Sequence, residues 1–214
     1  MIRPPGRAGV QRKIQAFLRA LAARGWKPME RMTPPEARAA LADLQSSVTI
    51  DLPNADVARR TITSDGQTVK LVVVRPVGLT GMVPAFMFFP GGGWMLGDFS
   101  THERLVRELV AGSGAAAVFV EYDRSPEAQY PVAINQAYAA TSWVAAHGSG
   151  IGVDGGRLAV AGNCAGGNMT AVVALMAKDR GRPSIRCQVL MWPVTNAAFD
   201  TPSYDETNSR KDTS

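Results

Sequence analysis

The spacing of apolar residues divides the chain into a helical leading part and a longer part in which strands and helices alternate. In the leading part, one helical stripe is formed by Val10, Ile14, Phe17, Leu18 and Leu21. Thr33-Pro34-Pro35-Glu36 has the pattern of a capping box with proline at the first helical position, which predicts a second helix to about Leu44. Neither helix can bury its stripe alone, so both are expected to pack on the rest of the protein or on a partner.

From residue 57 the pattern changes to that of an α/β protein. The runs 57–63 and 68–74 flank Ser64-Asp65-Gly66-Gln67 and predict a hairpin. Further strands are predicted over 84–89, 115–122, 157–161 and 185–192, and helices over 101–111, 131–146 and 165–178. The continuous apolar runs are typical of strands that are buried on both faces. We therefore expect a mainly parallel central sheet that begins with a hairpin and is flanked by helices.

Composition is that of one globular domain with an appended segment: 214 residues, of which 46% are hydrophobic. No apolar run of 18 residues or more is present, so no transmembrane segment is expected. The N-terminus lacks the apolar stretch of a secretory signal. Two cysteines, Cys164 and Cys187, form no disulfide framework, which favours a reducing compartment and predicts a cytoplasmic protein.

Charge is unevenly spread along the chain. Residues 1–38 carry a net charge of +7 and the remainder carries −2. A basic helical segment can bind nucleic acid or an anionic membrane, and that hypothesis would require salt-sensitive binding through residues 1–38. The basic residues are interleaved with apolar ones, however, as on a solvated helix face, and no nucleic-acid-binding motif accompanies them. We therefore expect no nucleic-acid partner.

The segment Gly162-Asn163-Cys164-Ala165-Gly166 has the spacing of G-x-S-x-G, the sharp strand-to-helix turn that presents a nucleophile above a sheet. Small residues on both sides of the apex suit such a turn, and the apex would lie at a helix N-terminus, which favours negative charge. From the motif alone, Cys164 is a working nucleophile, a disabled one, or a small side chain in an ordinary glycine-rich turn.

A second glycine-rich segment, Pro90-Gly91-Gly92-Gly93-Trp94, directly follows the predicted strand 84–89. Three successive glycines expose backbone N–H groups that can surround a developing oxyanion. A flexible loop and a phosphate cradle are the other interpretations. The phosphate interpretation is weak because neither the P-loop pattern nor the dinucleotide-binding pattern is present.

Three motifs in order resemble those of the hormone-sensitive-lipase-like esterases, over about residues 30–206. They are the glycine–aromatic loop in 91–98, the Tyr-Asp-Arg-Ser-Pro-Glu stretch in 122–133, and the nucleophile turn in 157–168. The resemblance implies an α/β-hydrolase fold. It also implies that residues 1–50 form a helical cap segment over the acyl pocket and that residues 51–214 form the catalytic core.

The same resemblance implies a set of site residues. Position 164 would attack the acyl carbonyl, while the backbone N–H groups of Gly91, Gly92 and Ala165, with Gly93 as a further donor, would hold the oxyanion. The residues expected to line the acyl or alcohol pocket, each equally compatible with plain packing, are Trp94, Met95, Phe99 and Tyr204. No metal and no cofactor is implied.

Two residues depart from the family pattern. Pro90 stands where the family has histidine, and Cys164 stands where it has serine. A thiolate is a good nucleophile, but sulfur is bulkier than oxygen and an oxyanion hole placed for an alkoxide need not suit it. Cysteine occurs at this apex in dienelactone-hydrolase-like enzymes, whose other signatures this chain lacks. We therefore expect the active form to carry serine at position 164 and regard this chain as a nucleophile mutant.

The catalytic acid and histidine are not identified in this chain. In this fold they follow the nucleophile, yet the only two histidines, His102 and His147, precede Cys164. Both are expected to have structural or surface roles. We therefore expect a chain that is truncated at its C-terminus, or completed by a second fragment of the same protein or by a second copy. As printed, it is expected to be inactive.

The function predicted from these observations is hydrolysis of small-molecule carboxylic esters with short to medium acyl chains, through an acyl-enzyme. The alternative is a non-catalytic member of the same fold that binds a small molecule. A gene that extends past Ser214 and encodes a histidine near its end would favour the enzyme, whereas a natural stop at that position would favour the binder.

Overall fold

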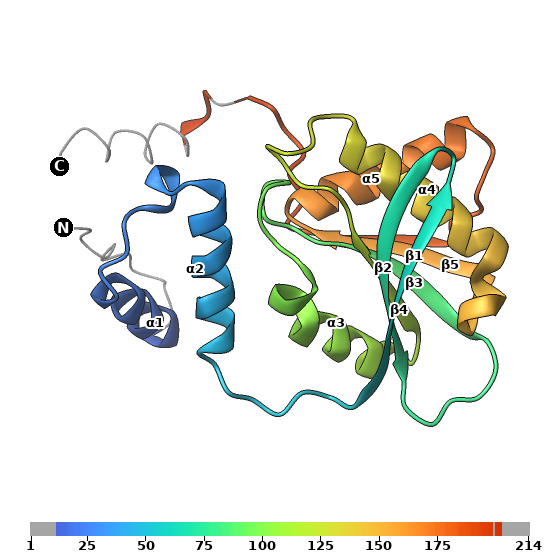
Figure 1. Cartoon of the computed structure of the whole chain (residues 1–214), viewed down its shortest axis with the longest axis horizontal. Helices are drawn as coiled ribbons and strands as arrows, with labels where there is room; N and C mark the ends of the chain where they lie inside the picture. Colours follow the sequence, from blue (N-terminus) through green and yellow to red (C-terminus); the bar gives the residue numbers. More distant parts are fainter. Residues whose placement is uncertain (1–11, 199, 203–214) are drawn as a thin grey trace. The chain divides into compact units, whose positions relative to one another are not determined.

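A six-stranded mixed sheet is the centre of the larger of two units in the computed structural model (Figure 1). The structure describes residues 12–198 and 200–202. The larger unit spans Pro34–Thr195, and the smaller one comprises Met1–Thr33 with Asn196–Ser214. Within the described part of the smaller unit lie α1 (Arg12–Ala23) and η1 (Met29–Arg31). The second predicted helix, α2 (Pro34–Ser46), belongs to the larger unit, where it packs against α3 (Phe99–Ser113).

The sheet has the strand order β1-β2-β4-β3-β5-β6. Its strands are β1 (Ala55–Ser64), β2 (Gln67–Pro76), β3 (Val83–Phe89), β4 (Ala116–Glu121), β5 (Val153–Asn163) and β6 (Cys187–Met191). The hairpin β1–β2 joins the sheet through an antiparallel pairing of β2 with β4, and the remaining pairings are parallel. The hairpin turn Asp65-Gly66 has positive φ at both residues, as a tight type I′ turn requires. The predicted mainly parallel sheet with a leading hairpin is confirmed.

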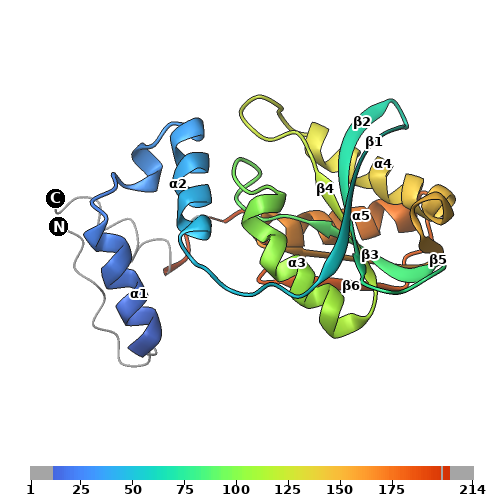
Figure 2. The same cartoon turned by 60° about the horizontal axis from the view of Figure 1, so that its bottom comes forward.

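Helices cover both faces of the sheet because side chains along each strand alternate between the two faces. On one face, α4 (Val132–His147) and α5 (Ala165–Asp179) pack over inward residues such as Leu71, Met87 and Val118. On the other face, α3 packs over Phe88 and Phe119. Figure 2 shows α3 on the opposite side of the sheet from α4 and α5. Strands β3 and β4, which are buried on both faces, are the continuous apolar runs seen in the sequence.

The last strand corrects one expectation. Residues 185–192 were predicted to form a strand, and a free cysteine in an apolar strand is commonly buried, but the Cys187 side chain is exposed. Strand β6 pairs only with β5 among the described residues and therefore lies at the edge of the sheet. An edge strand has one neighbour instead of two, so an apolar run in the sequence does not guarantee burial there.

None of the helices within residues 12–198 has both the length and the apolar character needed to cross a membrane.

Two exposed glycines near the end of α3 test how backbone conformation contributes to stability. Neither Gly112 nor Gly114 has another atom within 4 Å of the position of an added Cβ, but only Gly114 has a positive φ, of 67°. We expect Gly112→Ala to raise the free energy of unfolding by about 0.5–1 kcal/mol, because alanine loses less backbone entropy in a helix. Gly114→Ala should lower it by roughly 1 kcal/mol, because a side chain disfavours the left-handed region. Urea unfolding followed by circular dichroism measures both. Changes of the same sign would contradict the assignment of Gly114 as the helix cap.

Candidate active site

Cys164 lies alone between the end of β5 and the start of α5, with φ at 53° and ψ at −119°. Only a few per cent of residues other than glycine adopt a positive φ, and such conformations persist where surrounding structure enforces them. Here the Cys164 N–H donates to the Met191 carbonyl at 3.0 Å, while its carbonyl accepts from Asn168 N at 3.1 Å. The backbone of the apex is therefore held on both sides, as in a turn that presents its side chain.

Close backbone contacts explain why the turn requires glycine on both sides of the apex. A Cβ on Gly166 would collide with the carbonyl oxygen of Phe89, at the end of β3, and a Cβ on Gly162 would collide with the carbonyl oxygen of Gly166. The start of α5 thus rests directly on the end of β3. Because β3 leads into Pro90 and the glycine loop, this contact also brings that loop to the apex. A Cβ on Gly91 would lie 3.1 Å from the Cβ of Cys164.

The loop from Gly91 to Gly97, here called the oxyanion loop, is a tight turn. The carbonyl of Gly92 accepts from Met95 N at 3.1 Å and from Leu96 N at 2.8 Å. Within the described residues, the N–H groups of Gly92 and Gly93 have no hydrogen-bond acceptor. The N–H of Ala165 begins α5 and has no acceptor within its own helix. These three N–H groups therefore have no hydrogen-bond acceptor within the described residues.

Gly91 has a different role from the one predicted. Its N–H donates to the Oδ1 of Asn163 at 3.0 Å, so this donor is already engaged. The bond ties the start of the oxyanion loop to the residue that precedes the apex. In the sequence, Asn163 is one position of the turn motif, and no pattern there indicates a role for its side chain.

Tyr122 holds the same loop from the next strand. Its hydroxyl donates to the carbonyl of Pro90 at 2.9 Å, in a buried position. Burial raises the pKa of the phenol above its ordinary value, so the hydroxyl keeps its proton and remains a donor. The sequence had marked Tyr122 only as part of a family motif. A tyrosine at the end of a predicted buried strand is the signal that could have indicated this role.

Both histidines pack against aromatic side chains. His102 lies on α3, packs against Phe88 and Phe119 with ring centroids 6.1 and 6.0 Å away, and its Nδ1 is bonded to Thr101 Oγ1 at 3.0 Å. Burial lowers the pKa of His102. His147, at the end of α4, is exposed and stacks on Trp143. His102 also interacts with the side chain of Asn163, which precedes the apex, and the structural role of both histidines stays a prediction.

The predicted pocket residues separate into different environments. Trp94 and Met95 belong to the oxyanion loop and are half-buried. Phe99, in contrast, is buried in the core and meets Phe119 edge-on at 5.4 Å, so the prediction that it lines the pocket is wrong. The reason is that Phe99 begins α3 and faces the sheet. Tyr204 lies outside the described residues.

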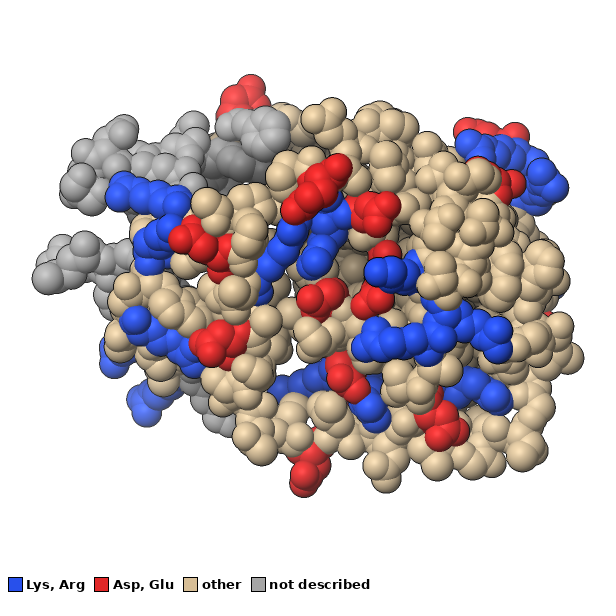
Figure 3. Space-filling model, in the orientation of Figure 1, with Lys and Arg blue, Asp and Glu red and all other residues tan. Residues whose placement is uncertain are grey.

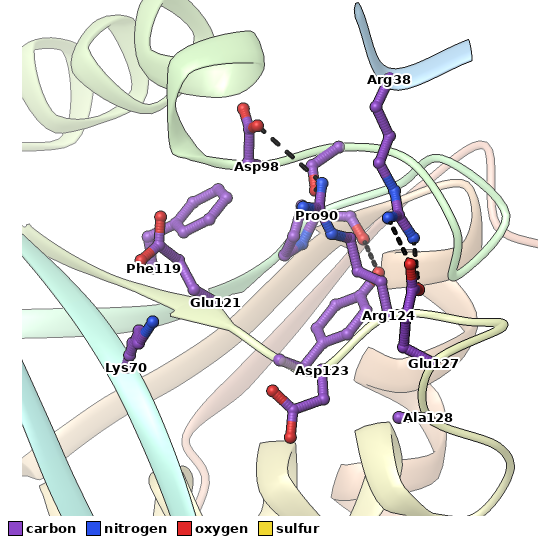
Figure 4. Close-up of a pocket in the computed structure, with 12 residues that line it drawn as sticks. Arg38, Lys70, Pro90, Asp98, Phe119, Glu121, Asp123, Arg124, Glu127 and Ala128 are labelled. Carbon is purple, nitrogen blue, oxygen red and sulfur yellow. Dashed lines mark hydrogen bonds and ion pairs between the residues drawn. The ribbon is translucent and has the colours of Figure 1, made fainter. Parts of the chain in front are cut away.

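A polar cavity of about 580 Å³ lies beside the oxyanion loop (Figure 4). Pro90, Gly97 and Tyr122 line it together with charged residues of both signs, including Arg38, Asp98 and Glu127. Cys164 is not among its lining residues.

Basic and acidic side chains are also interspersed over the face of the sheet unit seen in Figure 3. No cluster of three or more His, Cys, Asp or Glu residues that could hold a metal ion occurs within the part of the chain that the structure describes.

Arg38 extends from α2 to this cavity and forms a two-point ion pair with Glu127. Its Nη1 and Nη2 donate to the two carboxylate oxygens at 2.8 and 2.7 Å. The hydrogen bonds from Arg38 lower the pKa of Glu127 to about 2. The pair joins residues 89 positions apart in the sequence, and nothing in the sequence pattern indicates that they meet.

Comparison with known proteins now identifies the family. A model that describes the alpha/beta hydrolase fold matches residues 86–214. The chain belongs to the α/β-hydrolase family. Carboxylesterase NlhH of Mycobacterium tuberculosis is 37% identical over 171 residues, which cover 79% of this chain and 53% of that protein. The predicted resemblance to the hormone-sensitive-lipase-like members is confirmed.

Solved structures agree with this assignment. A thermostable esterase from Pseudomonas putida is 59% identical, with a TM-score of 0.91 over 94% of this chain and 63% of that one. A fungal esterase from Rhizomucor miehei is 35% identical, with a TM-score of 0.81 over 89% of this chain and 61% of that one. The chain thus spans about half the length of the curated relatives it matches and less than two thirds of these structures.

The exposure of the two thiols predicts their order of reaction. In the folded 214-residue chain, Cys187 should react with a bulky maleimide faster than Cys164, because Cys187 is exposed while Cys164 is only partly exposed and lies against the Gly91 backbone. The single-thiol variants Cys164→Ser and Cys187→Ser allow each rate to be measured separately, and urea-unfolded samples provide the control. Faster labelling of Cys164 would show that the apex is more open than this geometry allows.

The Arg38–Glu127 pair predicts a pH-dependent contribution to stability. The folded-state pKa of Glu127, about 2, lies below its usual value of 4.5. The pair's stabilisation is therefore fully present above about pH 4.5 and is lost as the pH falls towards 2. Urea unfolding should show that Glu127→Gln destabilises the chain at pH 7 and has a smaller effect at pH 3.5. The same substitution in an Arg38→Met background should show no such change, and a pH-independent effect in the parent would contradict the ion-pair origin.

Proposed function

We propose that this chain is the nucleophile-bearing part of a carboxylic-ester hydrolase that acts through an acyl-enzyme on esters with short to medium acyl chains. One observation carries the proposal: position 164 is held at a positive φ in contact with a loop whose Gly92 and Gly93 N–H groups are unengaged. The names of the relatives, a carboxylesterase and several esterases, support the same class of substrate.

In the proposed reaction, the oxygen or sulfur at position 164 attacks the acyl carbonyl and its proton passes to a histidine base. The carbonyl oxygen becomes an oxyanion and accepts hydrogen bonds from the N–H groups of Gly92, Gly93 and Ala165. Such donors are effective because they are in place before charge develops. The intermediate then releases the alcohol, which takes the proton, and water hydrolyses the acyl-enzyme. The catalytic acid and the histidine are proposed to come from residues outside this chain.

Gly91 is assigned a supporting role instead of an oxyanion contact. Its N–H donates to Asn163 Oδ1, and this bond orients the peptide planes that follow. Trp94 and Met95 follow the two donor glycines and are proposed to face the substrate side of the loop. Residues 1–50 are proposed to act as a cap, with α2 attached to the core unit. Two free cysteines are compatible with a cytoplasmic location.

Cysteine at position 164 favours a second candidate, a non-catalytic small-molecule binder. A thiol at this apex can form a thioester, but its larger atom displaces the carbonyl from donors placed for a serine oxygen. If cysteine is the native residue and no histidine base is supplied, the turn and the oxyanion loop would form a binding site for a carbonyl or carboxylate group. The proposed active form carries serine.

The decisive assay uses the complete protein with serine at position 164. We expect Cys164→Ser to hydrolyse short-chain nitrophenyl esters at least about 10³-fold faster than Cys164→Ala, because loss of a triad nucleophile costs several orders of magnitude in rate. The 214-residue chain should be close to the Ala variant. If the serine form is no faster than the alanine form, the esterase proposal fails, and tight binding of esters by both would support the binder.

A further inference from the structure

The guanidinium of Arg38 contacts two separate loops at once. Besides its two bonds to Glu127, its Nε donates to the Met95 carbonyl at 2.8 Å and its Nη2 to the Ser125 carbonyl at 2.8 Å. The side chain is only 20% exposed, although it reaches across the cavity from α2. Figure 4 shows the guanidinium directed at the Glu127 carboxylate. Arg38 therefore joins a helix, the oxyanion loop and the loop that follows β4.

These two loops are also bonded to each other. Ser125 N donates to the Trp94 carbonyl at 2.9 Å, and Arg124 Nη1 donates to the Gly97 carbonyl at 3.1 Å. The peptide group whose Met95 carbonyl accepts from Arg38 also carries the Leu96 N–H, which donates to the Gly92 carbonyl at 2.8 Å. That carbonyl belongs to the same peptide group as the Gly93 N–H, so the peptide that Arg38 fixes is one hydrogen bond away from a proposed oxyanion donor.

This arrangement differs from an ordinary surface ion pair. An exposed pair such as Arg104–Glu108, along one turn of α3, contributes little because both side chains are solvated. Arg38 instead directs donors at two backbone carbonyls as well as at a carboxylate. A planar guanidinium can satisfy all of them together, whereas the single ammonium of lysine cannot match that geometry.

We propose that Arg38 is a positioning residue, which acts with Glu127 to fix the oxyanion loop from α2. Helix α2 is then part of the catalytic scaffold and not only a cover. The kinetic part of this inference rests on the proposed esterase function, but the structural part does not.

The first experiment needs no activity. Hydrogen exchange of the Met95 and Leu96 amides, which donate to the Gly92 carbonyl, should accelerate about tenfold in Arg38→Met of the 214-residue chain, as expected when a hydrogen bond that holds the loop is lost. The matched control is Arg104→Met, which removes an arginine of the exposed pair and should leave these amides unchanged. Equal exchange in the parent and in Arg38→Met would overturn the proposal.

The second experiment uses the complete protein with serine at position 164. Arg38→Lys and Arg38→Ala should lower kcat by roughly 10- to 100-fold per folded molecule with little change in KM, as expected from a small displacement of the reacting geometry. Millimolar guanidinium, but not sodium at equal ionic strength, should restore part of the activity of Arg38→Ala. Arg104→Ala should retain full activity. If the activity of Arg38→Ala falls only in proportion to the fraction of folded protein, and guanidinium restores none of it, the positioning role is wrong and Arg38 only stabilises the fold.

The two experiments separate the possible failures. If the serine form shows no hydrolysis above its alanine control, the proposed function fails, while the exchange experiment still decides whether Arg38 fixes the loop. If the serine form is active and Arg38→Ala is unchanged in both exchange and kcat, only the positioning role is lost.

Discussion

The contact between the start of α5 and the end of β3 is the constraint on which the site depends. The backbone of Gly166 lies so close to the Phe89 carbonyl that no side chain fits between them. With α5 pressed against β3, the single residue between β5 and α5 must reverse the chain at a positive φ. The same contact brings Pro90 and the oxyanion loop to the apex, so position 164 and the loop that carries the proposed anion donors are assembled together.

Side chains from three different parts of the larger unit hold the oxyanion loop in place. Asn163 holds Gly91 from the turn, Tyr122 holds Pro90 from the end of β4, and Arg38 holds Met95 from α2. Glycines make the loop narrow enough to surround an anion, but they also leave its backbone conformationally free. External hydrogen bonds therefore supply the order that the loop sequence lacks, and preorganised donors are the kind that stabilise a developing charge.

Local sequence patterns were sufficient to predict the strand and helix order, the sheet type and the turn at position 164. These features follow from local rules: the two-residue period of strands, continuous apolar runs in buried strands, and glycine where backbones approach closely. For the same reason, the approach of the glycine loop at Gly91 to Cys164 could be predicted from two glycine-rich segments that each follow a strand. Family resemblance added the chemical interpretation.

Which backbone groups are hydrogen-bonded and which side chains are exposed depends on how distant segments pack together. The N–H of Gly91, a predicted oxyanion donor, donates instead to the side chain of Asn163, 72 residues away. Phe99 faces the core because of the direction in which α3 leaves the loop, and Cys187 is exposed because β6 lies at the edge of the sheet. Arg38 and Glu127 meet across 89 residues. None of these outcomes follows from local pattern, because each depends on which distant backbone or side chain occupies the neighbouring space.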